Sequence, residues 1–156
     1  MKVLAIDVGT ELSGFCLLDS DSLKPIEFGK IYNDDLLKKV KFSNYDELVY
    51  EEFQCYGMPI GASTIKSITW NGRCIQSAYD RGKKVDYIFR QEEKLHICHD
   101  TKAKDSNIRQ ALIDRFATND LKNGKGTKKN PDFFYGFKAD MWSAYAIGLT
   151  YIETKR

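Results

Sequence analysis

The chain has 156 residues, of which 42% are apolar, and this matches one domain with its own hydrophobic core. Its net charge is only +2, but residues 101–130 carry eight Lys or Arg against three Asp, which makes that segment +5 and the remainder −3. Charge is spread through the chain without a Pro- or Ser-rich run, which excludes general disorder and a long interdomain linker. We therefore expect a single domain over 1–156, with a flexible basic loop at 122–130.

The chain shows no sign of a targeting or membrane segment. Four apolar residues after Lys2 are followed by a carboxylate, unlike a signal peptide. The longest stretches without an ionised side chain, 53–65 and 141–152, are shorter than the ~20 residues of a membrane helix. The four cysteines form no CxxC pair, so we expect reduced, buried thiols. Together these features predict a soluble, cytoplasmic protein.

Short apolar runs separated by turn residues predict three antiparallel strands at the start of the chain, over 2–8, 14–19 and 26–32. Both faces of the first run are apolar apart from Asp7, which indicates a central strand that is buried on both sides. The charged stretch 33–47 is short and leaves little room for a helix.

The rest of the chain predicts strands at 48–55 and 85–89 and helices at 61–79, 105–116 and about 138–153. The N-cap of the second helix is expected at Asp105 or Ser106. The three residues of the HICH segment, His96, Cys98 and His99, are expected at a strand end, because no second group of ligands completes a zinc site. The fold class is α/β: a five-stranded mixed sheet with its first three strands antiparallel and helices on both faces.

Three carboxylates stand in apolar surroundings. Asp7 lies near the end of the central strand, Glu51 and Glu52 are adjacent in another strand, and Asp140 is followed by the small and apolar residues of the last helix. An isolated buried carboxylate is unfavourable by several kcal/mol unless it is paired, protonated or metal-bound. Each has an ordinary alternative: a turn acceptor for Asp7, an edge-strand charge for the glutamates and a helix N-terminal charge for Asp140. Together they suggest one site for a hard cation such as Mg²⁺.

The segments that carry these carboxylates resemble those of RuvC-type Holliday junction resolvases. The opening VLAIDVGTELSGFCLLD is similar to the first hairpin of that family, LVYEEFQCYG to its fourth strand and KADMWSAYAIG to its last helix. The segment TKAKDSNIRQAL resembles the part of the family in which a lysine precedes a helix. The resemblance spans most of residues 1–155, and its motifs are specific by their order.

The resemblance implies a ribonuclease H-like fold and endonucleolytic cleavage of Holliday junctions or branched DNA by a homodimer with Mg²⁺, for which Mn²⁺ substitutes. It assigns catalysis to Asp7, Glu51, Asp140 and Lys104, with the three carboxylates as metal ligands and Lys104 as an electrostatic partner. The family's further Asp is replaced here by Phe137, so Glu52 or a water is an alternative at the second metal, and Asp132 and Lys138 are the nearest ionisable residues. A phage-encoded protein acting in a bacterial host cytoplasm fits the same resemblance.

The basic segment predicts a surface that contacts phosphates. The residues assigned to it are Lys102, Lys104, Arg109, Lys122, Lys125, Lys128, Lys129 and Lys138. The neighbouring aromatic residues Phe133, Phe134, Tyr135 and Phe137 either stack on unpaired bases or belong to the core. An apolar stripe in the 61–79 helix is either core or the surface of a C2 dimer, and its residues are Ile65, Ile68, Gly72, Ile75 and Tyr79.

Two other functions remain open. One is a branched-DNA-binding protein with a degenerate catalytic site, which the phenylalanine at position 137 motivates. The other is a small ribonuclease H-like nuclease that processes RNA. The DVGT segment also resembles the phosphate-binding turn of actin-like ATPases, but those need two such domains and several hundred residues, so the length of 156 argues against them.

Overall fold

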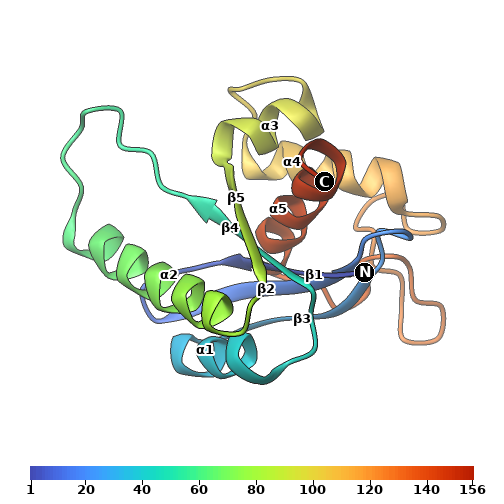
Figure 1. The fold of residues 1–156 in the computed structure, drawn as a ribbon. Helices are drawn as coiled ribbons and strands as arrows, with labels where there is room; N and C mark the ends of the chain where they lie inside the picture. Colours follow the sequence, from blue (N-terminus) through green and yellow to red (C-terminus); the bar gives the residue numbers. More distant parts are fainter.

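A computed structural model describes residues 1–156, and its centre is one five-stranded sheet in the order β3-β2-β1-β4-β5 (Figure 1). The strands are β1 (Lys2–Asp7), β2 (Leu12–Asp19), β3 (Pro25–Tyr32), β4 (Glu47–Glu52) and β5 (Lys84–Phe89). The helices are α1 (Asn33–Phe42), α2 (Ala62–Asp80), α3 (Arg90–Cys98), α4 (Asp105–Phe116) and α5 (Met141–Thr154). The first three strands pair antiparallel, whereas β1–β4 and β4–β5 are parallel, which confirms the expected mixed sheet.

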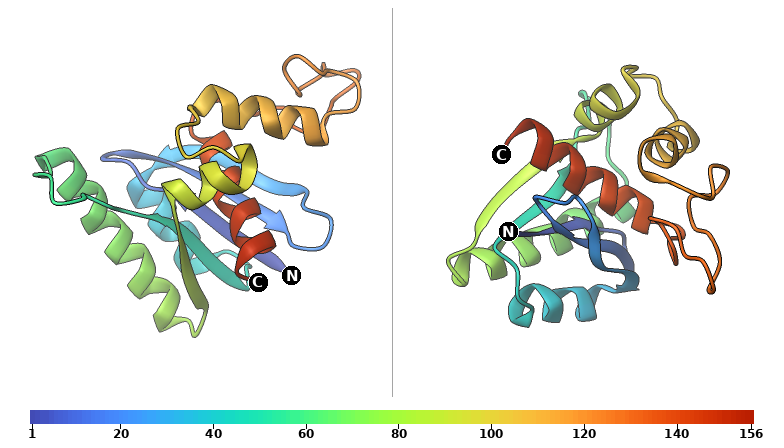
Figure 2. Two further views of the ribbon diagram at one scale, coloured as in Figure 1. Left: turned by 90° about the horizontal axis from the view of Figure 1, so that it is seen from above. Right: turned by 90° about the vertical axis from the view of Figure 1, so that its right-hand side faces the viewer.

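Helices cover both faces of this sheet, so two hydrophobic layers form around β1 (Figures 1 and 2). Leu4 and Ile6 join the layer under α1 and α2, whereas Val3 and Ala5 join the layer under α5. The alternation of side chains along a strand produces this division, and it confirms that β1 is buried on both sides. None of the helices is long and apolar enough to span a membrane.

Helix α5 lies close against the sheet because it carries a glycine at the contact. A Cβ at Gly148 would come within 3.0 Å of the Ala5 Cβ and would collide with the Leu18 side chain. Ten of the helix's 14 residues are buried, and its N-terminal end is brought over β2. There, a Cβ at Gly14 would come within 2.8 Å of the Asp140 Cβ, so glycine is required for this approach.

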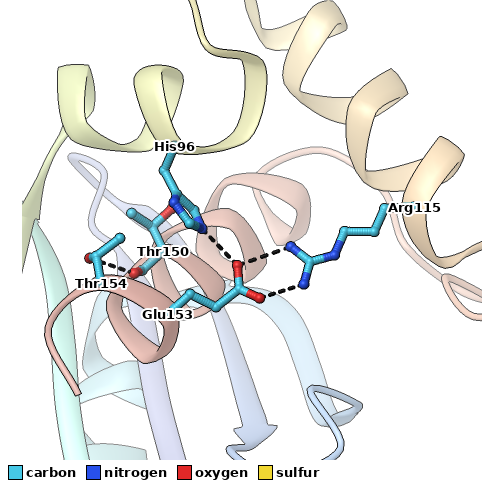
Figure 3. Close-up of polar contacts among 5 residues, drawn as sticks. All are labelled: His96, Arg115, Thr150, Glu153 and Thr154. Carbon is cyan, nitrogen blue, oxygen red and sulfur yellow. Dashed lines mark hydrogen bonds and ion pairs between the residues drawn. The ribbon is translucent and has the colours of Figure 1, made fainter.

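A polar cluster ties α3 and α4 to the C-terminal end of α5 (Figure 3). The His96 Nε2 lies 2.6 Å from Glu153 Oε2, and Arg115 donates to both oxygens of the same carboxylate, one of them at 2.9 Å. The expectation that the HICH segment ends a strand is wrong: His96 and Cys98 lie in α3, and His99 is its C-cap in the left-handed region with φ of 57°. The apolar pattern gave no sign of α3 because its one buried residue is a glutamate.

Several expected boundaries differ in the structure. The 33–47 stretch does hold a helix, α1, because Leu36 and Val40 lie one turn apart and bury themselves against the sheet. Strand β4 ends at Glu52, where its pairing with β5 ends, rather than at Cys55. Helix α5 starts at Met141, since Ala139 takes a positive φ of 48° just before it.

Two further expectations need correction. The N-cap of α4 is Lys104, whose backbone N–H donates to the Asn107 side chain at 2.9 Å. Not all the thiols are buried: all four cysteines are free, but Cys55 is exposed and Cys98 only partly buried.

The stripe of α2 faces outward rather than into the core. Its buried residues are Ser67, Asn71, Cys74 and Ala78. Ile65, Ile68 and Tyr79 are 52%, 38% and 55% exposed, so the interpretation of the stripe as core is wrong for these residues, whereas Ile75 is partly buried against the core. Helix α2 therefore presents an apolar surface that the chain itself leaves uncovered.

Candidate active site

Asp7 and Glu51 become neighbours because β1 and β4 run parallel. Ile6 lies opposite Tyr50 in the register, so the residues that follow each of them, Asp7 and Glu51, reach the same edge of the sheet. Asp7 shares its face with Val3 and Ala5, which pack under α5. The carboxyl ends of the two strands thus bring two acidic side chains together.

Glu51 and Glu52 point to opposite faces. Glu51 shares its face with Val49, in the layer under α5. Glu52 lies on the other face, where its carboxylate accepts hydrogen bonds from the Tyr50 hydroxyl at 3.1 Å and from the Phe53 N–H at 2.9 Å. Of the two glutamates, the structure places Glu51 on the side of Asp7.

Asp140 reaches the same region from the N-cap position of α5. Its carboxylate pairs with the Lys30 ammonium of β3 at 2.8 Å, and about two fifths of the side chain is exposed. The contact with Gly14 described above sets this end of the helix directly beside Asp7, because Gly14 is the antiparallel partner of Asp7. Three segments far apart in the sequence therefore deliver the three expected carboxylates to one place.

The carboxylates are close enough to act on one another. Burial, and then the negative charges of Glu51 and Asp140, raise the pKa of Asp7 from 3.8 to about 7, against the opposing effect of Arg90 and Lys30. Burial likewise raises the pKa of Glu51, which Arg90 and Lys94 partly offset. Burial is the larger cause at both residues, so the site disfavours the ionised form of each carboxyl, and at Asp7 the neighbouring carboxylates add to this effect.

Two residues at this site were not expected from the sequence, and both come from the first turn of α3. Arg90 pairs with Glu93 at 2.6 Å and with Asp105 at the start of α4. Glu93 is fully buried; burial is the main cause that raises its pKa to about 8, and Glu51 and Asp7 add to it while Arg90 opposes it. The one signal in the sequence was the i, i+3 spacing of Arg90 and Glu93, which is typical of a helical ion pair.

No three His, Cys, Asp or Glu side chains are arranged to hold a metal ion, and the Asp140 carboxylate is paired with Lys30. The chemistry of the set nevertheless fits a divalent cation. Hard ions such as Mg²⁺ prefer carboxylate oxygens, and a bound cation would favour the ionised form of Asp7, which burial and the neighbouring carboxylates disfavour. The residues that would hold it are Asp7, Glu51 and Asp140.

Two clefts flank these carboxylates. One, of about 250 Å³, is lined by Asp7, Glu51 and the first turns of α2. The other, of about 160 Å³, is lined by Asp140, Arg90, Glu93 and Arg109. We call the sheet edge that carries Asp7, Glu51 and Asp140 the acidic edge, and a cleft is thus open to a ligand on each side of it.

Some of the basic residues that were expected to contact DNA line a cleft next to Asp140, and the others are exposed on the surface. Arg109 lies over the Trp142 ring and also lines a third cleft with Lys122 and Lys125, so this cleft adjoins the one that contains Asp140. The remaining residues are exposed on the surface, and they are Lys102, Lys104, Lys128, Lys129 and Lys138. Arg90 and Lys30, rather than Lys104, are the cations that act on Asp7.

Asp132 organises the basic loop, although it was expected only as an ionisable residue near the site. Its carboxylate accepts hydrogen bonds from the backbone N–H groups of Thr118, Asn119, Asp120 and Phe133. Burial opposes ionisation, but these donors outweigh it and hold the pKa of Asp132 well below its usual range. Both ends of the 122–130 segment are therefore tied to one carboxylate.

The aromatic residues before α5 are mainly core. Phe134 and Phe137 are buried to 0% and 1% exposure, and Phe137 packs on Phe28 and Trp142 with ring centroids 4.4 and 5.2 Å apart. The interpretation of these two as base-stacking residues is wrong, whereas Tyr135 is 44% exposed. A carboxylate at position 137 would face this aromatic cluster.

No protein-family model matches the chain, and no curated protein matches its sequence. Solved structures do match by fold, among them the following two. Thermus thermophilus RuvC superposes with a TM-score of 0.68 at 16% identity, over 97% of this chain and 93% of that one. T. thermophilus RuvC in complex with Holliday junction substrate gives a TM-score of 0.70 at 14% identity, over 97% of this chain and 92% of that one. The chain therefore has a ribonuclease H-like fold of the RuvC type.

Proposed function

We propose that this protein is a metal-dependent endonuclease that resolves Holliday junctions and other branched DNA. The observation that carries the proposal is the convergence of Asp7, Glu51 and Asp140 from β1, β4 and α5 at one edge of a RuvC-like sheet. The neighbour in complex with Holliday junction substrate supports the choice of DNA as the substrate. Such a role belongs to DNA recombination and repair in the cytoplasm, where free thiols like the four found here persist.

The mechanism rests on the three carboxylates as oxygen donors for Mg²⁺, with Mn²⁺ as a substitute. When bound, the metal supplies Lewis-acid stabilisation of the phosphorane and lowers the pKa of the attacking water. Asp7 and Glu51 are held on rigid strand ends, so their oxygens need little reordering. Asp140 must release Lys30, which leaves that ammonium free to meet a phosphate oxygen. Lys104, at the start of α4, would add positive charge near the leaving group.

The DNA-binding surface extends from the acidic edge over α4 and the basic loop. Arg109 belongs to both adjoining clefts, one containing Asp140 and the other containing Lys122 and Lys125. A strand whose scissile phosphate lies at Asp140 would therefore continue over these cations. Lys102, Lys128, Lys129 and Lys138 extend the same positive surface, and such contacts give strong, salt-dependent binding with little sequence preference.

A homodimer would allow two opposed strands to be cut. The outward stripe of α2 offers the interface, because Ile65, Ile68 and Tyr79 are exposed together on one side of a 19-residue helix. A C2 axis through this helix pairs like with like, and it would place two equivalent acidic edges on one assembly. One such edge per chain makes pairing necessary for two cuts.

The test is cleavage of a synthetic four-way junction in Mg²⁺ by the wild type, Asp7→Asn and a matched control. Asp35→Asn serves as the control because Asp35 is exposed on α1, on the opposite face of the sheet. We expect the wild type and the control to cut and Asp7→Asn to bind without cutting. Junction binding without cutting by the wild type would instead favour the second candidate, a branched-DNA-binding protein, which the apolar Phe137 motivates.

A further inference from the structure

Glu93 is the one fully buried carboxylate beside the acidic edge, and only half of it is satisfied. Its Oε1 accepts from Arg90 at 2.6 Å. Its Oε2 is buried and has no hydrogen-bond partner. A buried carboxylate oxygen without a partner has lost its hydration without compensation, so a ligand at this oxygen would stabilise the site.

The position of Glu93 shows where that ligand would lie. Glu93 lines the cleft of about 160 Å³ together with Asp140 and Arg90. It also lies within electrostatic range of Asp7 and Glu51. Glu93 therefore adjoins Asp7, Glu51 and Asp140 from the side of α3.

Arg90 does not neutralise these carboxylates by itself. Its guanidinium is shared between Glu93 and Asp105, so one cation serves two carboxylates while Asp7 and Glu51 lie close by. The polar cluster of His96, Arg115 and Glu153 fixes α3, the helix that carries Glu93, on α5 (Figure 3). A divalent cation would satisfy the free oxygen and favour the ionised form of the neighbouring carboxylates.

We propose that Glu93 is a fourth carboxylate ligand of the metal centre, supplied by α3, and that its unpartnered oxygen faces the metal. This assignment rests on the proposed nuclease function, because the other three ligands are those of the proposed active site. It differs from a purely structural role for Glu93, in which the ion pair with Arg90 would be its whole contribution.

The test measures Mn²⁺ affinity directly, by the electron paramagnetic resonance signal of free Mn²⁺ during a titration of the intact protein. Glu93→Gln keeps the size of the side chain and removes its charge. Glu27→Gln is the matched control, because Glu27 on β3 is likewise a glutamate paired with a cation, Lys39, and lies on the face of the sheet that α1 covers. We expect Glu93→Gln to weaken Mn²⁺ binding by about 10–100-fold and Glu27→Gln to leave it unchanged.

Unchanged affinity in a folded Glu93→Gln protein would overturn the proposal, and so would an equal loss of affinity in Glu27→Gln. If Glu93→Gln does not fold, Glu93→Asp replaces it: the charge beside Arg90 stays, but the carboxylate is withdrawn by one methylene, and affinity should still fall at least tenfold. Full affinity in Glu93→Asp would contradict direct ligation.

The failure of this proposal is distinguishable from that of the proposed function. A wild type that binds Mn²⁺ and cuts junctions, with an unaltered Glu93→Gln variant, removes Glu93 as a ligand and leaves the nuclease intact. A wild type that neither binds Mn²⁺ nor cuts junctions removes both.

Discussion

Replacing Asp7 with Asn should make the metal-free protein more stable while abolishing cleavage. The pKa of Asp7 is raised from 3.8 to about 7 by burial and by the charges of Glu51 and Asp140. Because the folded state holds this carboxylate in the protonated form, ionising it above pH 7 costs the fold at most about 4 kcal/mol. Relaxation of the site lowers that value, so we expect Asp7→Asn to gain about 1–3 kcal/mol at pH 8.

The stability that Asp7→Asn gains over the wild type should increase with pH. Between about pH 4 and pH 7 the unfolded chain ionises Asp7 while the folded chain keeps its proton, so the wild type loses up to ~1.4 kcal/mol of stability per pH unit through this group. Asn does not titrate, so its advantage is about two fifths of its full value at pH 5 and nearly complete above pH 7. In Mg²⁺ the advantage should shrink or reverse, since only the wild type binds the cation there.

The assay is urea unfolding in EDTA at pH 5 and pH 8, followed by the fluorescence of Trp70 and Trp142. Asp35→Asn on α1 is the control and should match the wild type at both values. An Asp7→Asn protein no more stable than the wild type at pH 8 would refute the interpretation that this site disfavours the ionised form of Asp7.

Three further predictions concern the cation at Asp140, the basic loop and the packing of α5. Lys30→Gln frees the Asp140 carboxylate and should tighten Mn²⁺ binding by about 1.5–5-fold in the Mn²⁺ titration, because a partly exposed ion pair contributes a free energy of that size. Weaker binding would contradict competition between Lys30 and the metal. Replacing Lys125, Lys128 and Lys129 with Ala should lower the salt slope of junction binding by about 2–3, measured by fluorescence anisotropy at several salt concentrations, if all three contact phosphates; an unchanged slope removes them from the interface. Gly148→Ala should destabilise the fold by about 1–3 kcal/mol, measured by urea unfolding, because the new Cβ collides with Leu18. Gly72→Ala, on the open surface of α2, should leave the stability unchanged or raise it. Equal effects of the two variants would mean that α5 does not need this close approach.

The strands and the carboxylates were predictable because local patterns encode them. The apolar residues on both faces of β1 define a central strand, and a lone Asp7 within such a strand is conspicuous. Asp140 was predictable for the same reason, since it precedes a helix with ten buried residues. Each of these patterns can be recognised from the few residues that surround the carboxylate in the sequence.

The contribution of α3 was not predictable from such patterns. The helix buries Glu93, and its apolar residues are only partly covered, so no hydrophobic stripe identifies it. The choice between Glu51 and Glu52 likewise needed the register of β4 against β1 and the direction of α5. Features that depend on contacts between distant segments became visible only in the assembled fold.

The outward stripe of α2 shows a related limit. Its spacing correctly predicts a helix, but the same spacing suits a buried face and an interface between subunits. The face that the sheet covers carries Ser67, Asn71, Cys74 and Ala78, whose small or polar side chains gave no apolar signal. Periodicity alone therefore placed the helix and not its orientation.

The central claim is that the carboxylates of Asp7, Glu51 and Asp140 support paired, metal-dependent cuts in branched DNA. Its most direct test is a supercoiled plasmid that extrudes a cruciform, incubated with the wild type in Mg²⁺ or in EDTA. Two opposed cuts at the junction convert the plasmid to a linear form, whereas one cut only relaxes it. We expect linear product in Mg²⁺ and none in EDTA. A plasmid that stays supercoiled in Mg²⁺ while the protein remains bound to it would rule out cleavage by these carboxylates.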